Sequence, residues 1–198
     1  MALLLVAALD GGADRDEWAG RVSDGGPRWP DAAFDRLAEL LRKVADEAPE
    51  HVIVAFHPHA ATWIEAPDEV DALASRLAGR ARLCLDVGHY TVGGGDPVEA
   101  IGRHGALISH VHVKDVDGAV LARLRTREVH GFEASVRERI FTELGNGILD
   151  LAGVLRALDG IGYSGWLMVE QDSTWLEPSE AAAVGGRVLR YALREMGR

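Results

Sequence analysis

Short apolar runs that end in histidine or in an acid recur along this chain, and they limit the folds that it can adopt. Residues 52–56 lead into His57, residues 83–85 into Asp86, residues 107–108 into the segment 110–115, and residues 166–169 into Glu170. Buried strands of parallel sheets are short apolar runs, and ligands bind where their carboxyl ends meet. The pattern therefore predicts a metal-centred active site that is assembled from the ends of separate strands.

Helical patterns separate the predicted strands. Strands are expected at 3–8, 52–57, 82–86, 108–113 and 166–170, with a Gly/Asp-rich loop after the first strand. Helices are expected at 31–48, 119–129 and 132–141, and from Pro67, Asp96-Pro97, Asp150 and Pro178 onward. This alternation predicts an α/β fold with a parallel sheet and right-handed crossovers. The five strand–helix units that we count predict an incomplete TIM barrel, since a closed barrel has eight.

The long insertion between Asp115 and Leu149 follows the fourth predicted strand. Insertions after the carboxyl end of a strand usually form lids or pocket walls. A contact within a homo-oligomer is an alternative role for it. The sequence alone leaves both roles open.

Composition narrows the class of protein. A length of 198 residues, 47% of them hydrophobic, fits a single domain with a sizeable core. The net charge of −10 argues against nucleic acid as a partner, and no apolar run approaches the roughly 20 residues of a membrane span. The lone Cys84 rules out an internal disulfide framework and suits a reducing cytoplasm. We therefore expect a cytoplasmic protein with a small-molecule partner.

Asp86-Val87-Gly88-His89 places a carboxylate at a strand tip and an imidazole one turn later. Aspartate is a good ligand for a hard divalent ion, and the histidine could bind a substrate hydroxyl or move its proton. Gly88 is expected to let the backbone turn sharply. The alternative interpretation is a helix cap beside a surface histidine.

His110 and His112 lie two residues apart, so both face one side of their strand, with Lys114 on that side and Asp115 on the other. Each histidine could be an ordinary core residue, but burying two histidines and a lysine unpaired is costly. We interpret His112 as a metal ligand and His110 as a neighbouring residue that positions this ligand without binding the metal.

His57 and His59 repeat this spacing at another strand end, with Glu65 just beyond them.

Glu170 follows four apolar residues, where a carboxylate is expected only if it is paired or bound to metal, and we favour it over Gln171 and Asp172. Together with Asp86 and His112, His57 and Glu170 would form a mixed oxygen and nitrogen site. Such a site suits Mn²⁺, Co²⁺, Fe²⁺ or Zn²⁺ better than Ca²⁺.

Several of these segments resemble the xylose isomerase-like barrel superfamily of sugar isomerases, epimerases and endonuclease IV-type enzymes. The Asp86–His89 and His110–Asp115 motifs are common across that superfamily. The stretches 55–65 and 116–125 are similar more narrowly to the inosose dehydratases, which remove water from 2-keto-myo-inositol. The resemblance runs from about residue 3 to the end of the chain.

This resemblance implies metal ligation by Asp86, His112 and Glu170. The epimerases have a glutamate at the position of His57 and a second glutamate beyond it. The histidine at this position therefore favours a dehydratase over an epimerase. Whether His57 binds the metal directly or through water stays open. The implied cofactor is a divalent metal ion, with Mn²⁺ or Co²⁺ ahead of Zn²⁺ or Fe²⁺.

For the catalytic residues we expect His59, His89 or Glu65 to serve as the base, and Lys114 or a protonated histidine to help the hydroxyl leave as water. The expected reaction is loss of water from 2-keto-myo-inositol or a related cyclic polyol ketone. A ketose isomerase or 3-epimerase is the nearest alternative, and an abasic-site nuclease is the least favoured. Relatives begin with roughly three further strand–helix units, so a truncated, non-catalytic remnant is the other alternative.

Overall fold

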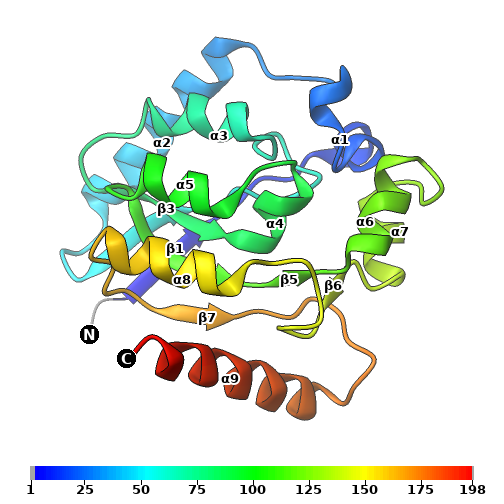
Figure 1. Cartoon of the computed structure of the whole chain (residues 1–198). Helices are drawn as coiled ribbons and strands as arrows, with labels where there is room; N and C mark the ends of the chain where they lie inside the picture. The colour runs from blue at the N-terminus through cyan, green and yellow to red at the C-terminus, as the bar shows by residue number, and fades with distance from the viewer. Residues whose placement is uncertain (1–2, 198) are drawn as a thin grey trace.

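The computed structural model describes residues 3–197, and a five-stranded parallel sheet forms its centre (Figure 1). The strands lie side by side in chain order, as β1 (Leu3–Ala7), β2 (Val52–Phe56), β3 (Ala81–Asp86), β4 (Ile108–Val113) and β7 (Leu167–Val169). Neighbours in sequence are thus neighbours in the sheet, as in a (β/α) barrel and unlike a doubly wound sheet, whose strand order reverses. The predicted incomplete barrel is confirmed.

Helices cover the outer face of this sheet (Figure 1). They are α2 (Asp31–Glu47), α3 (Pro67–Ala74), α5 (Pro97–His104), α8 (Leu151–Gly160) and α9 (Pro178–Glu195). One apolar cluster joins side chains from these helices to the outward side chains of the strands, among them Phe34, Leu73, Ile101, Leu155, Phe56, Leu83 and Val111. Burial of this cluster is the main stabilising contribution to the fold.

Local chemistry fixes where several helices begin. The Asp96 side chain accepts a hydrogen bond from the Val98 amide, and the Asp150 side chain accepts one from the Gly153 amide. Pro67, Pro97 and Pro178 occupy first-turn positions, where a missing amide hydrogen costs nothing. These starts confirm the predicted ones.

The expected loop after β1 is instead partly helical. It contains α1 (Gly12–Trp18) and a short 3-10 helix (Val22–Asp24). Seven residues are too few for a stable isolated helix, but Arg15 of α1 forms a buried ion pair with Glu69 of α3. A contact between segments far apart in sequence therefore stabilises α1, and no local sequence pattern predicts this contact.

The insertion after β4 is more irregular than predicted. It contains α6 (Gly118–Arg125), α7 (Phe132–Arg137) and a two-stranded antiparallel ribbon of β5 (Asp115–Val116) with β6 (Phe141–Thr142). The two predicted helices end early, because Arg127 and Arg139 adopt positive φ angles of 64° and 65°. An apolar cluster with Val120, Leu124 and Phe141 packs this insertion against the end of the sheet.

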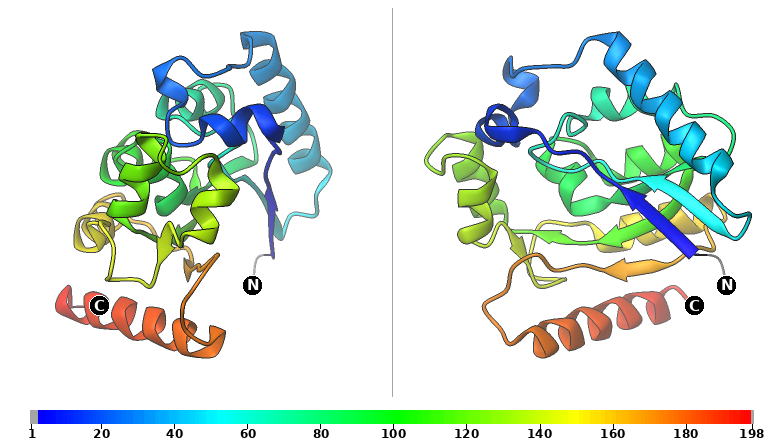
Figure 2. Two further views of the ribbon diagram at one scale, coloured as in Figure 1. Left: turned by 90° about the vertical axis from the view of Figure 1, so that its right-hand side faces the viewer. Right: turned by 180° about the vertical axis from the view of Figure 1, so that it is seen from behind.

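β1 and β7 form the two margins of the sheet (Figure 2). Apolar side chains at these margins are exposed, with Leu5 at 46%, Trp166 at 70% and Met168 at 51%. None of the helices within residues 3–197 is long and apolar enough to cross a bilayer.

Candidate metal centre

Four of the predicted site residues meet at the carboxyl ends of four strands of the sheet. His57 follows β2, Asp86 ends β3, His112 belongs to β4 and Glu170 follows β7. Each offers one ligand atom, and these atoms all lie within 4.8 Å of one another. We call these four residues the ligand group.

The ligand group contains an unusual concentration of unpaired polar atoms. Within residues 3–197, eight buried side-chain nitrogen or oxygen atoms have no hydrogen-bond partner, and four belong to the group: His57 Nε2, Asp86 Oδ2, His112 Nδ1 and Glu170 Oε2. Buried polar atoms are normally paired, because leaving them unpaired costs free energy. His112 Nδ1 is 2.5 Å from Glu170 Oε2 and 3.5 Å from Asp86 Oδ2. One cation among these atoms would satisfy all four, so the residues fit a metal ion.

The electrostatics of the group also favour a cation. Burial opposes protonation of His112, but its partners Asp86, Cys84 and Glu170 outweigh burial and raise its pKa to about 11. Burial by itself would raise the pKa of Asp86, yet the nearby Lys114 ammonium holds that pKa well below its usual value. Two imidazoles and two carboxylates form the donor set, which suits Mn²⁺, Co²⁺, Fe²⁺ or Zn²⁺.

His110 was expected to position His112 without binding the metal. Its ring lies 5.2 Å from that of His112, and its Nε2 is buried without a partner. The second nitrogen of His112, Nε2, lies instead 3.5 Å from Sγ of Cys84 on the neighbouring strand. From the sequence, Cys84 was considered only as a lone thiol. Strand pairing sets Cys84 opposite His110, and its Sγ reaches diagonally to the ring of His112.

A buried lysine lies directly beside the ligand group. Lys114 Nζ is 3.0 Å from His89 Nε2, 3.1 Å from Asp86 Oδ2 and 2.9 Å from Asp172 Oδ2. Its approach to Asp86 is an ion pair without the direction of a hydrogen bond. Burial lowers the pKa of Lys114, but Asp86, Asp172 and Glu170 outweigh it and the pKa is raised. Lys114 is therefore an ammonium at neutral pH.

His89 is the neutral member of this neighbourhood. Its side chain is 1% exposed, and burial lowers its pKa to about 3. Asp172, which sequence reasoning set aside in favour of Glu170, lies 3.5 Å from His89 Nε2 and pairs with Lys114. The signal that could have found Asp172 is its place two residues after Glu170, at the end of the same strand.

Gly88 is required by a close approach rather than by the sharp turn that was expected. It lies within α4 (Val87–Val92), and its φ is not among the positive ones. A Cβ at this position would lie 2.8 Å from Cγ of Lys114 and 3.0 Å from its carbonyl oxygen. The missing side chain therefore leaves room for the lysine stem.

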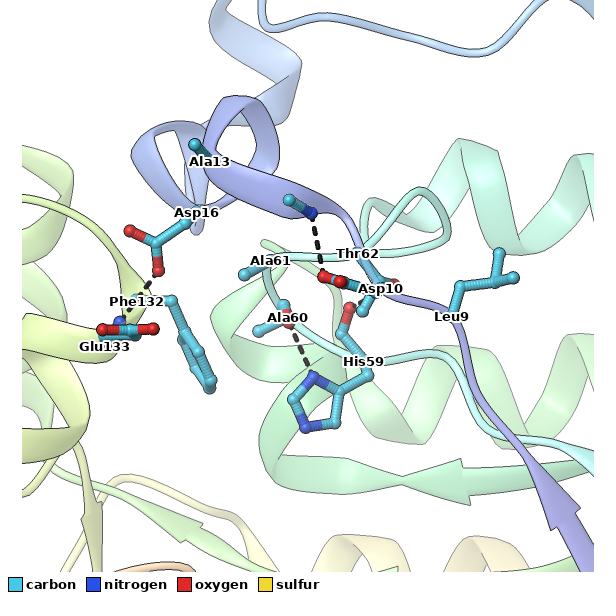
Figure 3. A pocket seen from close by; sticks show the side chains of 11 residues that line it. Leu9, Asp10, Ala13, Asp16, His59, Ala60, Ala61, Thr62, Phe132 and Glu133 are labelled. Atoms are coloured by element: carbon cyan, nitrogen blue, oxygen red, sulfur yellow. Dashed lines mark hydrogen bonds between the residues drawn. The ribbon is translucent and has the colours of Figure 1, made fainter.

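His59 lines a cavity of about 610 Å³ beside the ligand group, and Figure 3 shows its imidazole among the lining residues. Its ring centroid is 3.6 Å from that of His89 and 5.4 Å from that of His57. The cavity is lined by α1, by the loop after β2 and by α7. Figure 3 shows the Asp16 carboxylate of α1 accepting a hydrogen bond from the Glu133 amide of α7, which joins these two walls.

Glu65 makes different contacts from the other predicted site residues. Its two carboxylate oxygens accept hydrogen bonds from the backbone amides of Gly20, at 2.7 Å, and Ala61, at 2.6 Å. Burial raises its pKa to about 7. The side chain thus fastens the segment after α1 to the loop that carries His59.

Comparisons with known proteins agree with this geometry. The family model of the xylose isomerase-like TIM barrel matches residues 5–192. The chain is 40% identical to the rhizopine catabolism protein MocC of Rhizobium meliloti, over 81% of this chain and 48% of that protein. It is 30% identical to an inosose dehydratase of Geobacillus thermodenitrificans, over 96% of this chain and 64% of the enzyme. The chain thus spans about half to two thirds of the length of these relatives.

Solved structures show the same fold. An L-ribulose 3-epimerase superposes with a TM-score of 0.66 at 17% identity, over all of this chain and 78% of that one. The IOLI protein with a bound zinc atom gives a TM-score of 0.64 at 16% identity, over 98% of this chain and 63% of that one. With the family model covering nearly the whole sequence, the chain belongs to the xylose isomerase-like TIM barrel family.

Proposed function

We propose that this chain carries the active site of a metal-dependent hydro-lyase that removes water from 2-keto-myo-inositol or a related cyclic polyol ketone. The observation that carries the proposal is the ligand group, four unpaired donors at the ends of four strands with a neutral imidazole and an ammonium beside them. The inosose dehydratases among the relatives support the reaction class. The zinc-bound neighbour supports a divalent metal.

In this proposal His57, Asp86, His112 and Glu170 hold the metal. A divalent ion there supplies a Lewis acid that polarises the ketone oxygen and favours loss of the neighbouring proton. We place the base at His59, because burial lowers the pKa of its imidazole and leaves it unprotonated at neutral pH. His89, the other histidine expected as a base, already has both ring nitrogens engaged, by the Ala60 amide and by Lys114 Nζ. Proton transfer by such a group requires an unprotonated nitrogen within reach of the substrate.

Lys114 is the proposed acid, since its ammonium can donate a proton to the hydroxyl that leaves as water. Glu65 is proposed as a structural residue rather than a base, because backbone amides occupy both of its oxygens. The cavity beside His59 would receive the part of the ring that lies away from the metal. We place the activity in the cytoplasm, which the free Cys84 suits.

The test is to load the protein with Mn²⁺ or Co²⁺, add 2-keto-myo-inositol and follow the absorbance of the dione product. The Geobacillus inosose dehydratase is the positive control, and Asp86→Asn and His112→Gln are the inactive controls. We expect the dione from the wild type and none from these variants. Absence of product while the control enzyme is active would refute the proposal for this chain.

Two other outcomes would identify the alternatives. Incorporation of solvent deuterium into substrate without loss of water would indicate an isomerase or epimerase, the activity named for one solved neighbour. Weak metal binding together with a broad melting transition would indicate a non-catalytic remnant.

A further inference from the structure

We propose that Asp172 is a positioning residue that prevents Lys114 from competing with the metal for its carboxylate ligands. The inference rests on the metal centre proposed above. It concerns a residue outside the ligand group and gives that residue a role in metal affinity.

The competition follows from the position of the ammonium. Lys114 Nζ lies 3.1 Å from Asp86 Oδ2 and 3.5 Å from Glu170 Oε2. These two oxygens are among the unpaired atoms of the ligand group. A metal ion and the ammonium would therefore both be attracted to these two oxygens and would repel each other. The ammonium thus makes the binding free energy of the metal less favourable.

Lys114 cannot relieve this repulsion by moving into water. Its side chain is 1% exposed, its stem passes against Gly88, and its Nζ lies 4.7 Å from the centre of the Phe141 ring. A buried charge of this kind has to be balanced by neighbouring groups. The positive charge of Lys114 must therefore be neutralised by the carboxylates close to its Nζ.

Asp172 supplies that balance without belonging to the ligand group. Its Oδ2 is 2.9 Å from Lys114 Nζ, the shortest of the three carboxylate distances of the lysine. With His57 and His112 neutral as metal ligands, the carboxylates of Asp86, Glu170 and Asp172 match the charges of one ammonium and one divalent ion. Loss of Asp172 would leave two carboxylates to neutralise both cations.

Asp172→Asn should therefore weaken metal binding through Lys114. We expect the dissociation constant for Co²⁺ to rise about tenfold or more, the range seen when residues behind metal ligands are changed. In a Lys114→Met background the competitor is absent, so adding Asp172→Asn should change the constant by less than about threefold. Asp172→Glu should restore most of the wild-type affinity.

The experiment is a titration of the whole chain with Co²⁺, monitored by calorimetry and by visible absorbance. The proteins compared are the wild type, Asp172→Asn, Asp172→Glu, Lys114→Met and the double variant Lys114→Met with Asp172→Asn. Glu133→Gln, which removes an exposed carboxylate lining the neighbouring cavity, is the control for net charge. Thermal unfolding of each variant checks that it is folded. Asp172→Glu keeps the test informative if the asparagine variant does not fold.

The pattern of affinities separates this inference from its rivals. An equal loss from Asp172→Asn with and without Lys114 would mean simple attraction of the metal by Asp172, and would overturn the inference. Equal affinities of the wild type and Asp172→Asn would also overturn it, while leaving the metal centre intact. No Co²⁺ binding by the wild type would overturn the metal centre itself, and this inference with it.

Discussion

The buried ion pair between Arg15 and Glu69 should make a large contribution to the stability of this fold. The arginine is 0% exposed and the glutamate 2%, and two N–H···O bonds of 2.8 Å join them. Glu69→Gln would leave the guanidinium buried beside a neutral amide, and breaking one side of a buried pair costs about 3–5 kcal/mol. For a domain of this size that loss lowers the melting temperature by roughly 6–20 °C. Thermal unfolding followed by circular dichroism measures the shift, and urea unfolding measures the free energy.

Asp68→Asn is the matched control, since Asp68 precedes Glu69 and pairs with Arg28 at 2.6 Å. This pair is exposed, with 64% of the Asp68 side chain accessible, and exposed pairs contribute about 1 kcal/mol at most. Adding Arg15→Met to Glu69→Gln should recover part of the loss, because no unpaired charge then stays buried. Equal melting temperatures for Glu69→Gln and Asp68→Asn would refute the reasoning.

Three further predictions concern stability and the site. The pKa of Glu65 is about 7 in the folded chain against an ordinary 4.5. The folded state therefore binds this proton more tightly than the unfolded state, and the free energy of unfolding should fall as the pH rises from 4.5 through 7. Urea unfolding should show a flatter pH dependence for Glu65→Gln, and the same pH dependence as in the wild type would contradict this prediction. Asp115→Ala removes an acceptor for the amides of Gly145, Gly147 and Leu149 and should cost about 3 kcal/mol while Co²⁺ affinity in calorimetry stays unchanged. Gly88→Ala should cost about 1–3 kcal/mol by overpacking and change Co²⁺ affinity, because it displaces Lys114; a variant with wild-type stability and affinity would count against this close approach.

The strand ends could be predicted because two regularities determine them. Alternation along a strand places His110 and His112 on one side, and parallel pairing brings the carboxyl ends of β2, β3, β4 and β7 together. Both depend only on local sequence and on the kind of sheet. His57, Asp86, His112 and Glu170 could therefore be grouped before their distances were known.

Several features that escaped prediction depend on pairs of residues that are distant in the chain. α1 is stabilised by Arg15 and Glu69, and Lys114 finds its partner in Asp172. Gly88 is needed because Lys114 passes over it, which the sequence around Gly88 does not reveal. Such contacts depend on how segments that are far apart in the sequence pack together, and no local sequence period encodes that packing.

A ligand group drawn from four strand ends also has a consequence for the life of the protein in a cell. His57 and Glu170 come together only when the strands between them have paired, so the unfolded chain has no comparable site. A metal that binds only the folded form shifts the folding equilibrium by mass action, by about 2.7 kcal/mol at a free concentration one hundred times the dissociation constant. The supply of metal would then set the fraction of chains that escape proteolysis, and a shortage would reduce the amount of the protein as well as its activity.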